Sequence, residues 1–140
     1  MIKKLLILIS YIFLISNSLL AKNLYFEEGI NLFKDKKFQE AKFKFEQNIV
    51  FDPKSELSYL YLSKIFKNLD KKELQEHNLK TVILLNPENE EATFNLVKLK
   101  LESSDYKKSK ELNDRLNTLC NKFCKESEKL QIEIENLSKK

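Results

Sequence analysis

The chain has 140 residues, a length that suits one modest domain, and carries 25 lysine and arginine against 21 aspartate and glutamate side chains, a net charge of +4. Only one basic residue is an arginine, Arg115, whereas phosphate and base-edge recognition favours the planar donor fork of arginine. The composition therefore argues against nucleic acid as a partner.

The first 21 residues have the layout of a secretory signal peptide. A basic segment, MIKK, precedes the apolar run LLILISYIFLIS, and the small Ala21 stands just before Lys22. Leu19 departs from the small residue expected three positions before the cut. Without residues 1–21 the chain would carry 23 basic and 21 acidic side chains, a net charge of +2. We expect export with cleavage. A retained membrane anchor formed by residues 5–21 and a buried cytosolic helix stay open as alternatives.

The rest of the chain is predicted to be helical. Apolar residues recur at helical spacing, as at Phe38, Ala41, Phe45 and Ile49. No run alternates β-branched with polar residues, as a half-buried strand would. The chain is therefore expected to be all-α.

Two prolines reveal an internal repeat. Pro53 and Pro87 lie 34 residues apart in similar surroundings, IVFDPKSE and ILLNPENE. Each proline must lie between two helices, because it cannot continue the hydrogen-bond ladder of the preceding helix. The chain is therefore expected to repeat a helical hairpin.

The stretch around Pro53 resembles a tetratricopeptide repeat. With Lys22 as position 1, the characteristic positions 4, 8, 20, 24 and 32 of that family hold Tyr25, Gly29, Ala41, Phe45 and Pro53. The small residues Gly29 and Ala41 would let the two helices of the hairpin approach closely, while Tyr25 and Phe45 fill the flanks.

The next two repeats keep this register less completely. Residues 56–89 match at Tyr59, Leu62, Ser63, Phe66, Leu79, Val82 and Pro87. Gln75 replaces the small residue at position 20, so these two helices are expected to splay a little. Residues 90–123 match at Thr93, Leu96, Val97, Tyr106, Ser109 and Leu116, but Asn113 and Asn121 stand at positions 24 and 32.

One further amphipathic helix is predicted at residues 125–138. Its apolar residues are Leu130, Ile132, Ile134 and Leu137. A terminal helix with a polar outer face closes the last exposed surface of a helical solenoid. The expected architecture is an all-α helical-hairpin solenoid, with a signal peptide at 1–21, repeats at 22–55, 56–89 and 90–123, and a capping helix at 124–140.

The two cysteines, Cys120 and Cys124, fall where the first two repeats place a proline. A structural zinc site needs a full tetrahedral set of ligands, and the single histidine, His77, is one repeat away. The sequence also lacks the C-x-x-C-H of a haem attachment and a C-x-x-C motif near a predicted sheet. In an oxidising compartment a disulfide is the expected outcome.

A disulfide requires CNKFC to be a turn, because an unbroken helix holds residues i and i+4 too far apart for good disulfide geometry. The capping helix should then start near Lys125. Free or intermolecular thiols, and a redox or metal role for the pair, remain alternatives.

Nothing in the sequence indicates catalysis, a cofactor or a metal. There is no Ser-His-Asp arrangement, no glycine-rich phosphate loop and no histidine pair. His77, between Glu76 and Asn78, is expected to be solvent-facing or half-buried. The chain is not expected to be an enzyme.

The tetratricopeptide resemblance implies a protein-binding module whose concave face is lined by positions 2, 5, 9, 12 and 13 of each repeat. In the first repeat these positions hold Asn23, Phe26, Ile30, Phe33 and Lys34. In the second they hold Leu57, Leu60, Lys64, Lys67 and Asn68. In the third they hold Glu91, Phe94, Lys98, Leu101 and Glu102.

Several of these positions are apolar, which favours an interaction surface for a protein or peptide. The lysines among them would favour acidic segments, although long lysine stems can also simply cover apolar surface. The alternative is that the capping helix or a second copy of the chain covers this face. The family's carboxylate clamp needs lysine and asparagine where this chain has Phe26 and Ile30, so a chaperone C-terminal tail is not the expected ligand.

We interpret the sequence as that of an exported, periplasmic or secreted scaffold or adaptor, with a homo-oligomer left open. The first alternative is an assembly factor for an envelope complex, anchored by its N-terminal segment. The second is a thiol-active protein that uses Cys120 and Cys124.

Overall fold

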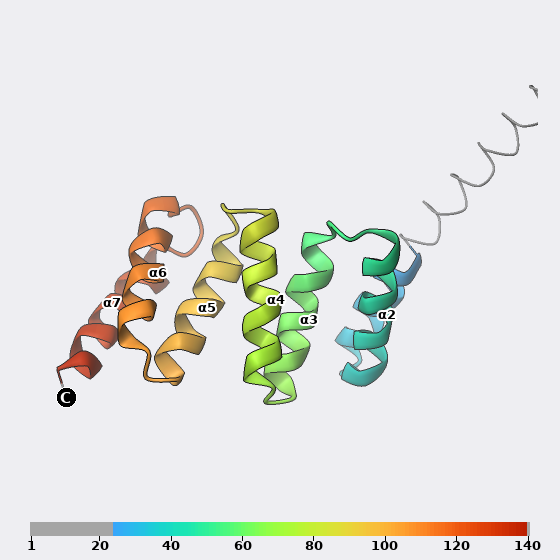
Figure 1. Cartoon of the computed structure of the whole chain (residues 1–140), viewed down its shortest axis with the longest axis horizontal. Helices are drawn as coiled ribbons and strands as arrows, with labels where there is room; N and C mark the ends of the chain where they lie inside the picture. Colours follow the sequence, from blue (N-terminus) through green and yellow to red (C-terminus); the bar gives the residue numbers. More distant parts are fainter. Residues whose placement is uncertain (1–23, 140) are drawn as a thin grey trace, which may run out of the picture. The chain divides into compact units, whose positions relative to one another are not determined.

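The computed structural model describes residues 24–139, which form helices joined by short turns (Figure 1). Helical residues 24–34 are followed by α2 (Phe38–Phe51), α3 (Glu56–Asn68), α4 (Lys72–Leu85), α5 (Glu90–Glu102), α6 (Tyr106–Leu119) and α7 (Cys124–Ser138). No residue from 24 to 139 lies in a strand. The predicted all-α helical-hairpin fold is confirmed, while the expected signal peptide lies outside the described residues.

The helix boundaries recur every 34 residues. The second helices of the hairpins, α2, α4 and α6, begin at Phe38, Lys72 and Tyr106. The helices α3, α5 and α7 begin at Glu56, Glu90 and Cys124. Helix α7 thus stands in the place of the first helix of a fourth repeat, and it starts one residue before the predicted Lys125.

Each hairpin turns through a residue in the left-handed region. These residues are Lys36, Asp70 and Ser104, with φ of 59°, 52° and 58°. The following residue donates its N–H to a carbonyl five positions earlier, and all three of these bonds, Lys37 to Leu32, Lys71 to Phe66 and Asp105 to Lys100, measure 2.9 Å. This pattern ends a helix while satisfying its last carbonyl groups.

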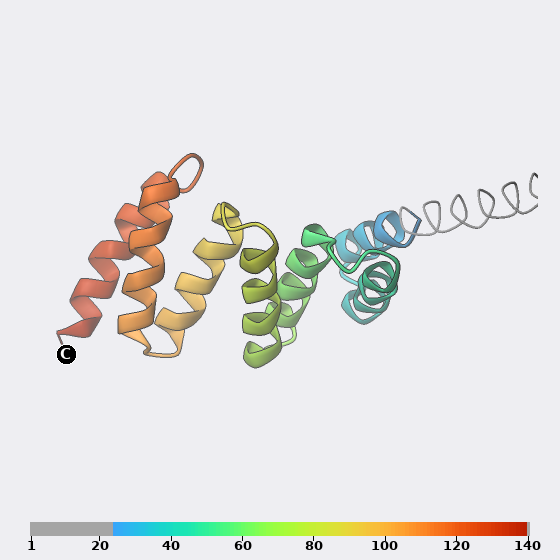
Figure 2. The same ribbon diagram turned by 45° about the horizontal axis from the view of Figure 1, so that its top comes forward.

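The chain divides into two compact units between Tyr61 and Leu62, inside α3. We refer to residues 24–61 as the N-terminal unit and to residues 62–139 as the C-terminal unit. In the C-terminal unit, α5, α6 and α7 lie side by side in chain order (Figures 1 and 2).

The core of the N-terminal unit depends on a close approach of two helices. Ala41 and Phe45 of α2 are fully buried. A Cβ atom added to Gly29 would lie 2.9 Å from Cε1 of Phe45, closer than carbon atoms normally pack. The predicted role of Gly29 as a point of close approach therefore fits the structure. Tyr25 lies at the flank, stacked on Phe51 with ring centroids 5.5 Å apart.

The C-terminal unit has a larger aliphatic core, built from α3 to α7. Its most buried members are Ile65, Leu79, Val82, Ala92, Val97, Leu116 and Ile134. The small Ser109 allows α5 and α6 to meet, and its Oγ donates to the carbonyl of Val97 at 3.1 Å. The bulkier Gln75, at the same repeat position, is buried in α4.

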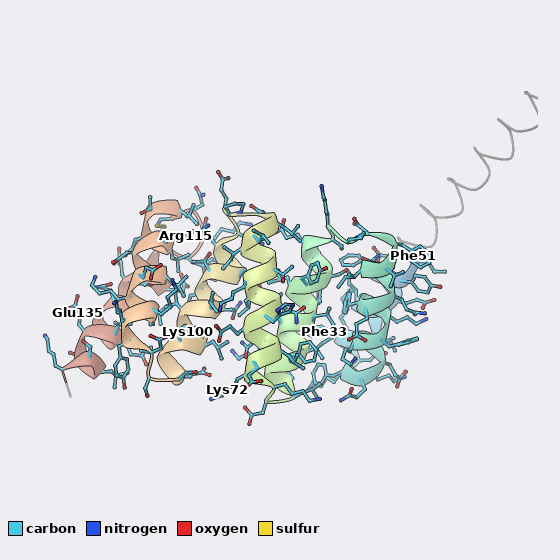
Figure 3. The ribbon with its side chains drawn as sticks, in the orientation of Figure 1. Phe33, Phe51, Lys72, Lys100, Arg115 and Glu135 are labelled. Carbon is cyan, nitrogen blue, oxygen red and sulfur yellow. A yellow bond between two sulfur atoms is a disulfide. The ribbon has the colours of Figure 1, made fainter. Side chains whose placement is uncertain are left out.

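Polar contacts attach the last helices to the core. Asn113 of α6 and Ser127 of α7 are both fully buried. The Ser127 hydroxyl donates to Oδ1 of Asn113 at 2.9 Å, and Nδ2 of Asn113 donates to the carbonyl of Ser127 at 3.1 Å. Arg115 of α6 donates from Nη2 to the carbonyl of Pro87 at 2.6 Å (Figure 3). Asn113 departs from the family pattern at its repeat position, and its hydrogen bonds with Ser127 give the structural reason.

Replacement of Gly29 by alanine should destabilise the protein. Overpacking against the Phe45 ring costs about 1–3 kcal/mol, which exceeds the roughly 1 kcal/mol that alanine gains over glycine inside a helix. Urea unfolding followed by circular dichroism measures the difference. Asn31→Ala, at an exposed position of the same helix, is the matched control. Equal or higher stability of Gly29→Ala would contradict the close approach.

Candidate functional site

Half-buried rings from the predicted groove belong to one aromatic cluster of the N-terminal unit. Phe26 lies edge-on to Phe45, with centroids 5.8 Å apart, and Phe33 lies edge-on to Tyr61 at 5.2 Å. Phe45 and Tyr61 are themselves stacked at 4.9 Å. These contacts orient Phe26 and Phe33 while leaving part of each ring exposed.

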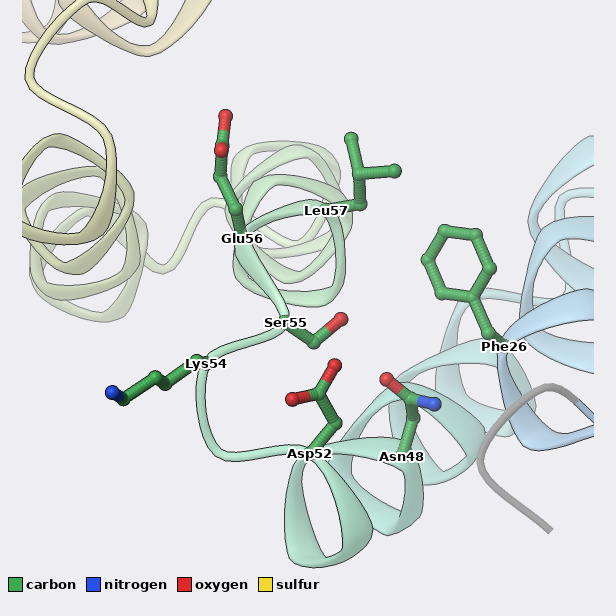
Figure 4. Close-up of a pocket in the computed structure, with 7 residues that line it drawn as sticks. All are labelled: Phe26, Asn48, Asp52, Lys54, Ser55, Glu56 and Leu57. Carbon is green, nitrogen blue, oxygen red and sulfur yellow. The ribbon is translucent and has the colours of Figure 1, made fainter. Parts of the chain in front are cut away.

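An open pocket of about 310 Å³ lies where the first described helix faces the turn between α2 and α3 (Figure 4). Its lining consists of Phe26, Asn48, Asp52, Lys54, Ser55, Glu56 and Leu57. Phe26 and Leu57, both expected at binding positions, therefore share one site. Leu57 is 51 % exposed, so its side chain is accessible from solvent.

Buried hydrogen bonds fix the turn beside this pocket. Ser58 donates from Oγ to Oδ1 of Asn48 at 2.7 Å, and Ser55 donates to the Ser58 hydroxyl at 2.9 Å. Asn48 and Ser58 are almost completely buried, where such bonds are strong and costly to break. The network joins α2 to α3 and holds Ser55 at the rim of the pocket.

The remaining predicted residues of the N-terminal unit differ in accessibility. Ile30 is half-buried and Lys34 is exposed, whereas Asn23 lies outside the described residues. The expectation that Leu60 faces a ligand is not met, because it is only 4 % exposed. On α3, Leu60 points into the interior while Leu57 points to solvent.

Three predicted residues lie near the end of α3 in the C-terminal unit. Lys64 forms an ion pair with Glu91 of α5, with Nζ 2.7 Å from Oε1. Lys67 and Asn68 are exposed. Because Glu91 already offsets the charge of Lys64, Lys67 is the more accessible positive charge of the two.

The predicted groove residue Phe94 is partly covered by the chain itself. Phe123, in the turn between α6 and α7, stacks on Phe94 with centroids 4.9 Å apart. Lys98 holds its Nζ 5.7 Å from the centroid of the Phe94 ring. The half-buried Phe94 and Phe123 rings and Lys98 thus form a small aromatic and cationic surface on the C-terminal unit.

The turn that carries Phe123 is a disulfide loop, residues 120–124. Cys120 and Cys124 are bonded, with their Cα atoms 5.1 Å apart, and residues 120–123 are outside any helix. The disulfide and the turn therefore agree with the prediction.

Glu90, which sequence reasoning missed, holds the disulfide loop against the start of α5. Its Oε1 accepts the N–H of Asn121 at 3.0 Å, and its Oε2 accepts those of Lys122 at 2.8 Å and Phe123 at 3.0 Å. These backbone bonds, that from Lys122 foremost, lower the pKa of Glu90. No local pattern could have found this contact, because it joins residues more than thirty positions apart.

The capping helix contributes to a second pocket, of about 220 Å³, between α5 and α7. Lys98, Leu101 and Glu102 line it from α5, and Leu130, Glu133 and Leu137 line it from α7. Leu101 is buried, so the expectation of an open Leu101 is also wrong. At this position α7 provides the cover that was considered as the alternative to a ligand.

Other charged groups are arranged as structural pairs. Glu76 of α4 contacts Lys100 of α5 at 2.7 Å and Lys80 at 2.6 Å. Hydrogen bonds to Glu76, first from Lys100 and then from Lys80, lower the pKa of Glu76.

His77 is exposed, as expected. Within residues 24–139 no group of three or more His, Cys, Asp or Glu side chains could hold a metal ion, and no helix is both long and apolar enough to cross a membrane.

Comparison with solved structures gives a clear match of fold. The type III secretion chaperone SycD of Yersinia enterocolitica, in complex with a peptide of the translocator YopD, is 15% identical with a TM-score of 0.73, over 83% of this chain and 91% of that chain. The TPR2B domain of yeast Sti1, in a complex with pHsp70, is 14% identical with a TM-score of 0.76, over 84% and 98%.

The second TPR domain of human RPAP3, in complex with the HSP70 peptide SGPTIEEVD, is 18% identical with a TM-score of 0.70, over 88% of this chain and 99% of that chain. The chain has the tetratricopeptide-repeat fold. No protein-family model and no curated protein matches the sequence. The tetratricopeptide assignment therefore rests on structural similarity and on the repeat register.

Removal of the disulfide should lower stability while leaving the helices intact. The disulfide restricts the unfolded chain, and closing so short a loop should add about 2 kcal/mol to the free energy of unfolding. Urea unfolding of the Cys120→Ser/Cys124→Ser variant measures the loss. The same experiment on the native protein with and without a reducing agent is the control. An unchanged free energy of unfolding would show that Glu90 alone holds the loop.

Glu90 should contribute a pH-dependent part of the stability. Because its pKa is lower in the folded than in the unfolded protein, the contribution is present above about pH 4.5, the ordinary glutamate pKa. It is lost as the pH falls through the lowered folded pKa. The difference in unfolding free energy between the native protein and Glu90→Gln should therefore be largest near neutral pH and shrink in acid. The matched control is Glu88→Gln, at an exposed position in the turn before α5. A trend of equal size in this control would contradict the role of Glu90.

Proposed function

We propose that the chain is a non-catalytic protein-binding module that acts outside the cytoplasm as a scaffold or adaptor. The observation that carries this proposal is the pocket of the N-terminal unit. It places the half-buried ring of Phe26 beside the exposed Leu57, within a rim of polar groups. A few apolar side chains in a concave site with polar margins suit an apolar anchor residue of a protein ligand.

The fold supports the same function. Solved structures of similar fold hold a translocator peptide and an HSP70 peptide. A chaperone tail is not proposed as the ligand here, because Phe26 and Ile30 occupy the positions that a carboxylate clamp needs.

The C-terminal unit favours acidic segments in the partner. Lys67 is exposed, and Lys98 stands beside the Phe94 ring. A carboxylate of the ligand would form an ion pair with either lysine. An apolar side chain of the ligand next to that carboxylate could pack on Phe94 or Phe123. This part of the proposal predicts that binding weakens as the salt concentration rises.

An extracytoplasmic location, periplasmic or secreted, is supported by the signal-peptide pattern of residues 1–21 and by the disulfide loop. Retention of the N-terminal segment as an anchor would keep the same binding surfaces at a membrane. The mass of the protein isolated from its own cells distinguishes the two forms.

Site-specific photo-crosslinking tests the pocket. A benzophenone amino acid in place of Leu57 should give discrete adducts with another protein in the cells that produce the chain. The matched control is the same substitution at Ile132, which is 61 % exposed on α7. Adducts should also decrease when Leu57 is labelled in a Phe26→Ala background that is still folded by circular dichroism.

Adducts of equal yield from positions 57 and 132 would contradict the proposal. So would adducts at position 57 that contain only a second copy of the chain.

A further inference from the structure

The outer face of α2 carries a stripe of apolar side chains that the chain leaves exposed. Phe43, Val50 and Phe51 are 57 %, 76 % and 46 % exposed. Positions 43 and 50 lie seven residues apart and therefore on the same side of the helix. Phe51 extends the stripe sideways through its stacking on Tyr25. We call Phe43, Val50 and Phe51 the α2 stripe.

Two charges near the ends of the stripe have no ion pair among residues 24–139. Glu40 lies in the first turn of α2, and Lys54 follows the end of α2. Both are exposed, and neither takes part in the ion pairs of the described chain, in which Lys42 pairs with Glu46 and Lys44 with Glu28. Glu40 therefore offers a negative charge at one end of the stripe and Lys54 a positive charge at the other, while the exposed Lys36 and Lys37 stand in the turn before α2.

This arrangement is self-complementary under a two-fold rotation. If two α2 helices pack antiparallel about an axis between Glu46 and Gln47, Phe43 of one copy lies beside Val50 of the other. The same rotation brings Glu40 of each copy next to Lys54 of the other. An isologous interface uses the same patch on both subunits in this way, with opposite charges meeting across it.

We propose that the α2 stripe is the interface of a homodimer, and that its occupant is the α2 stripe of a second copy. Antiparallel α2 helices, each about 21 Å long, pack Phe43 against Val50 twice, and two Glu40–Lys54 ion pairs close the ends. Each copy contributes one face of a single helix, and contacts that bury less than about 1,200 Å² are typical of weak, transient association. The dimer is therefore weak and forms at micromolar or higher concentrations.

Dimerisation leaves the pocket of the N-terminal unit available. The pocket is built on Phe26 and Leu57, neither of which belongs to the stripe. Lys54 lines the pocket by its stem, and its Nζ points away from Phe26 and Leu57 in Figure 4. Each copy in the dimer can therefore present its own binding pocket.

Sedimentation of the purified, disulfide-bonded protein over a range of concentrations tests the interface. The native protein should shift from monomer to dimer, and Val50→Asp should raise the dissociation constant at least about tenfold. Leu84→Asp is the matched control, because Leu84 stands 34 residues after Val50 and is 81 % exposed. It should leave the dissociation constant unchanged.

Charge reversal tests the two-fold pairing itself. Glu40→Lys or Lys54→Glu alone should weaken the dimer about threefold or more at low salt, because each change creates two repulsive contacts. The double variant Glu40→Lys/Lys54→Glu restores both ion pairs and should return to the native dissociation constant.

Three outcomes would overturn the proposal. If the protein stays monomeric at every concentration, a second copy does not occupy the stripe. A dimer that persists in Val50→Asp uses another surface. If the double variant Glu40→Lys/Lys54→Glu dimerises more weakly than either single variant, the antiparallel register is excluded. Circular dichroism of each variant shows that the fold is retained.

Discussion

The backbone turn inside each hairpin is the constraint on which the rest of the structure depends. Lys36, Asp70 and Ser104 all adopt positive φ, and in each case the next residue bonds back to the carbonyl five positions earlier. A non-glycine residue in this conformation costs on the order of 1 kcal/mol. The chain offsets that cost by burying the facing sides of the two helices, as Gly29 and Phe45 do in the first hairpin. The turn fixes the angle of the second helix, and so decides which side chains reach the core, the pocket and the outer face.

Much of this could be predicted from the sequence because the signals are periodic or local. The spacing of Pro53 and Pro87 gave the 34-residue repeat, and small residues at Gly29 and Ala41 predicted where helices approach. The disulfide followed from the two cysteines and the expected compartment. Exposure was harder to predict, since Leu60 and Leu101 occupy positions that the resemblance assigns to an open face. Their burial depends on which side of α3 faces the interior and on the placement of α7, neither of which the spacing of apolar residues determines.

The contacts that escaped prediction are polar and join residues distant in sequence. Glu90 holds three N–H groups of the disulfide loop, and Asn113 bonds to Ser127 across the contact of α6 with α7. Asn48 and Ser58 play the same part between α2 and α3. An apolar contact tolerates small displacements, whereas these buried pairs are satisfied in only one alignment of the helices. They position the surfaces that we propose for binding, since Ser55 at the pocket and Phe123 on Phe94 are both held through such bonds.

The constant spacing of the helix boundaries limits how such a chain can change in length. Residues 38, 72 and 106 begin the second helices of the hairpins, and residues 56, 90 and 124 begin α3, α5 and α7, without a single insertion or deletion between them. A residue gained or lost inside one of these helices would rotate the rest of that helix by about 100° and carry its apolar side chains away from the core. Duplication of a whole 34-residue segment preserves every rotation. Lengthening by entire hairpins is therefore the change in size that this architecture accommodates most readily.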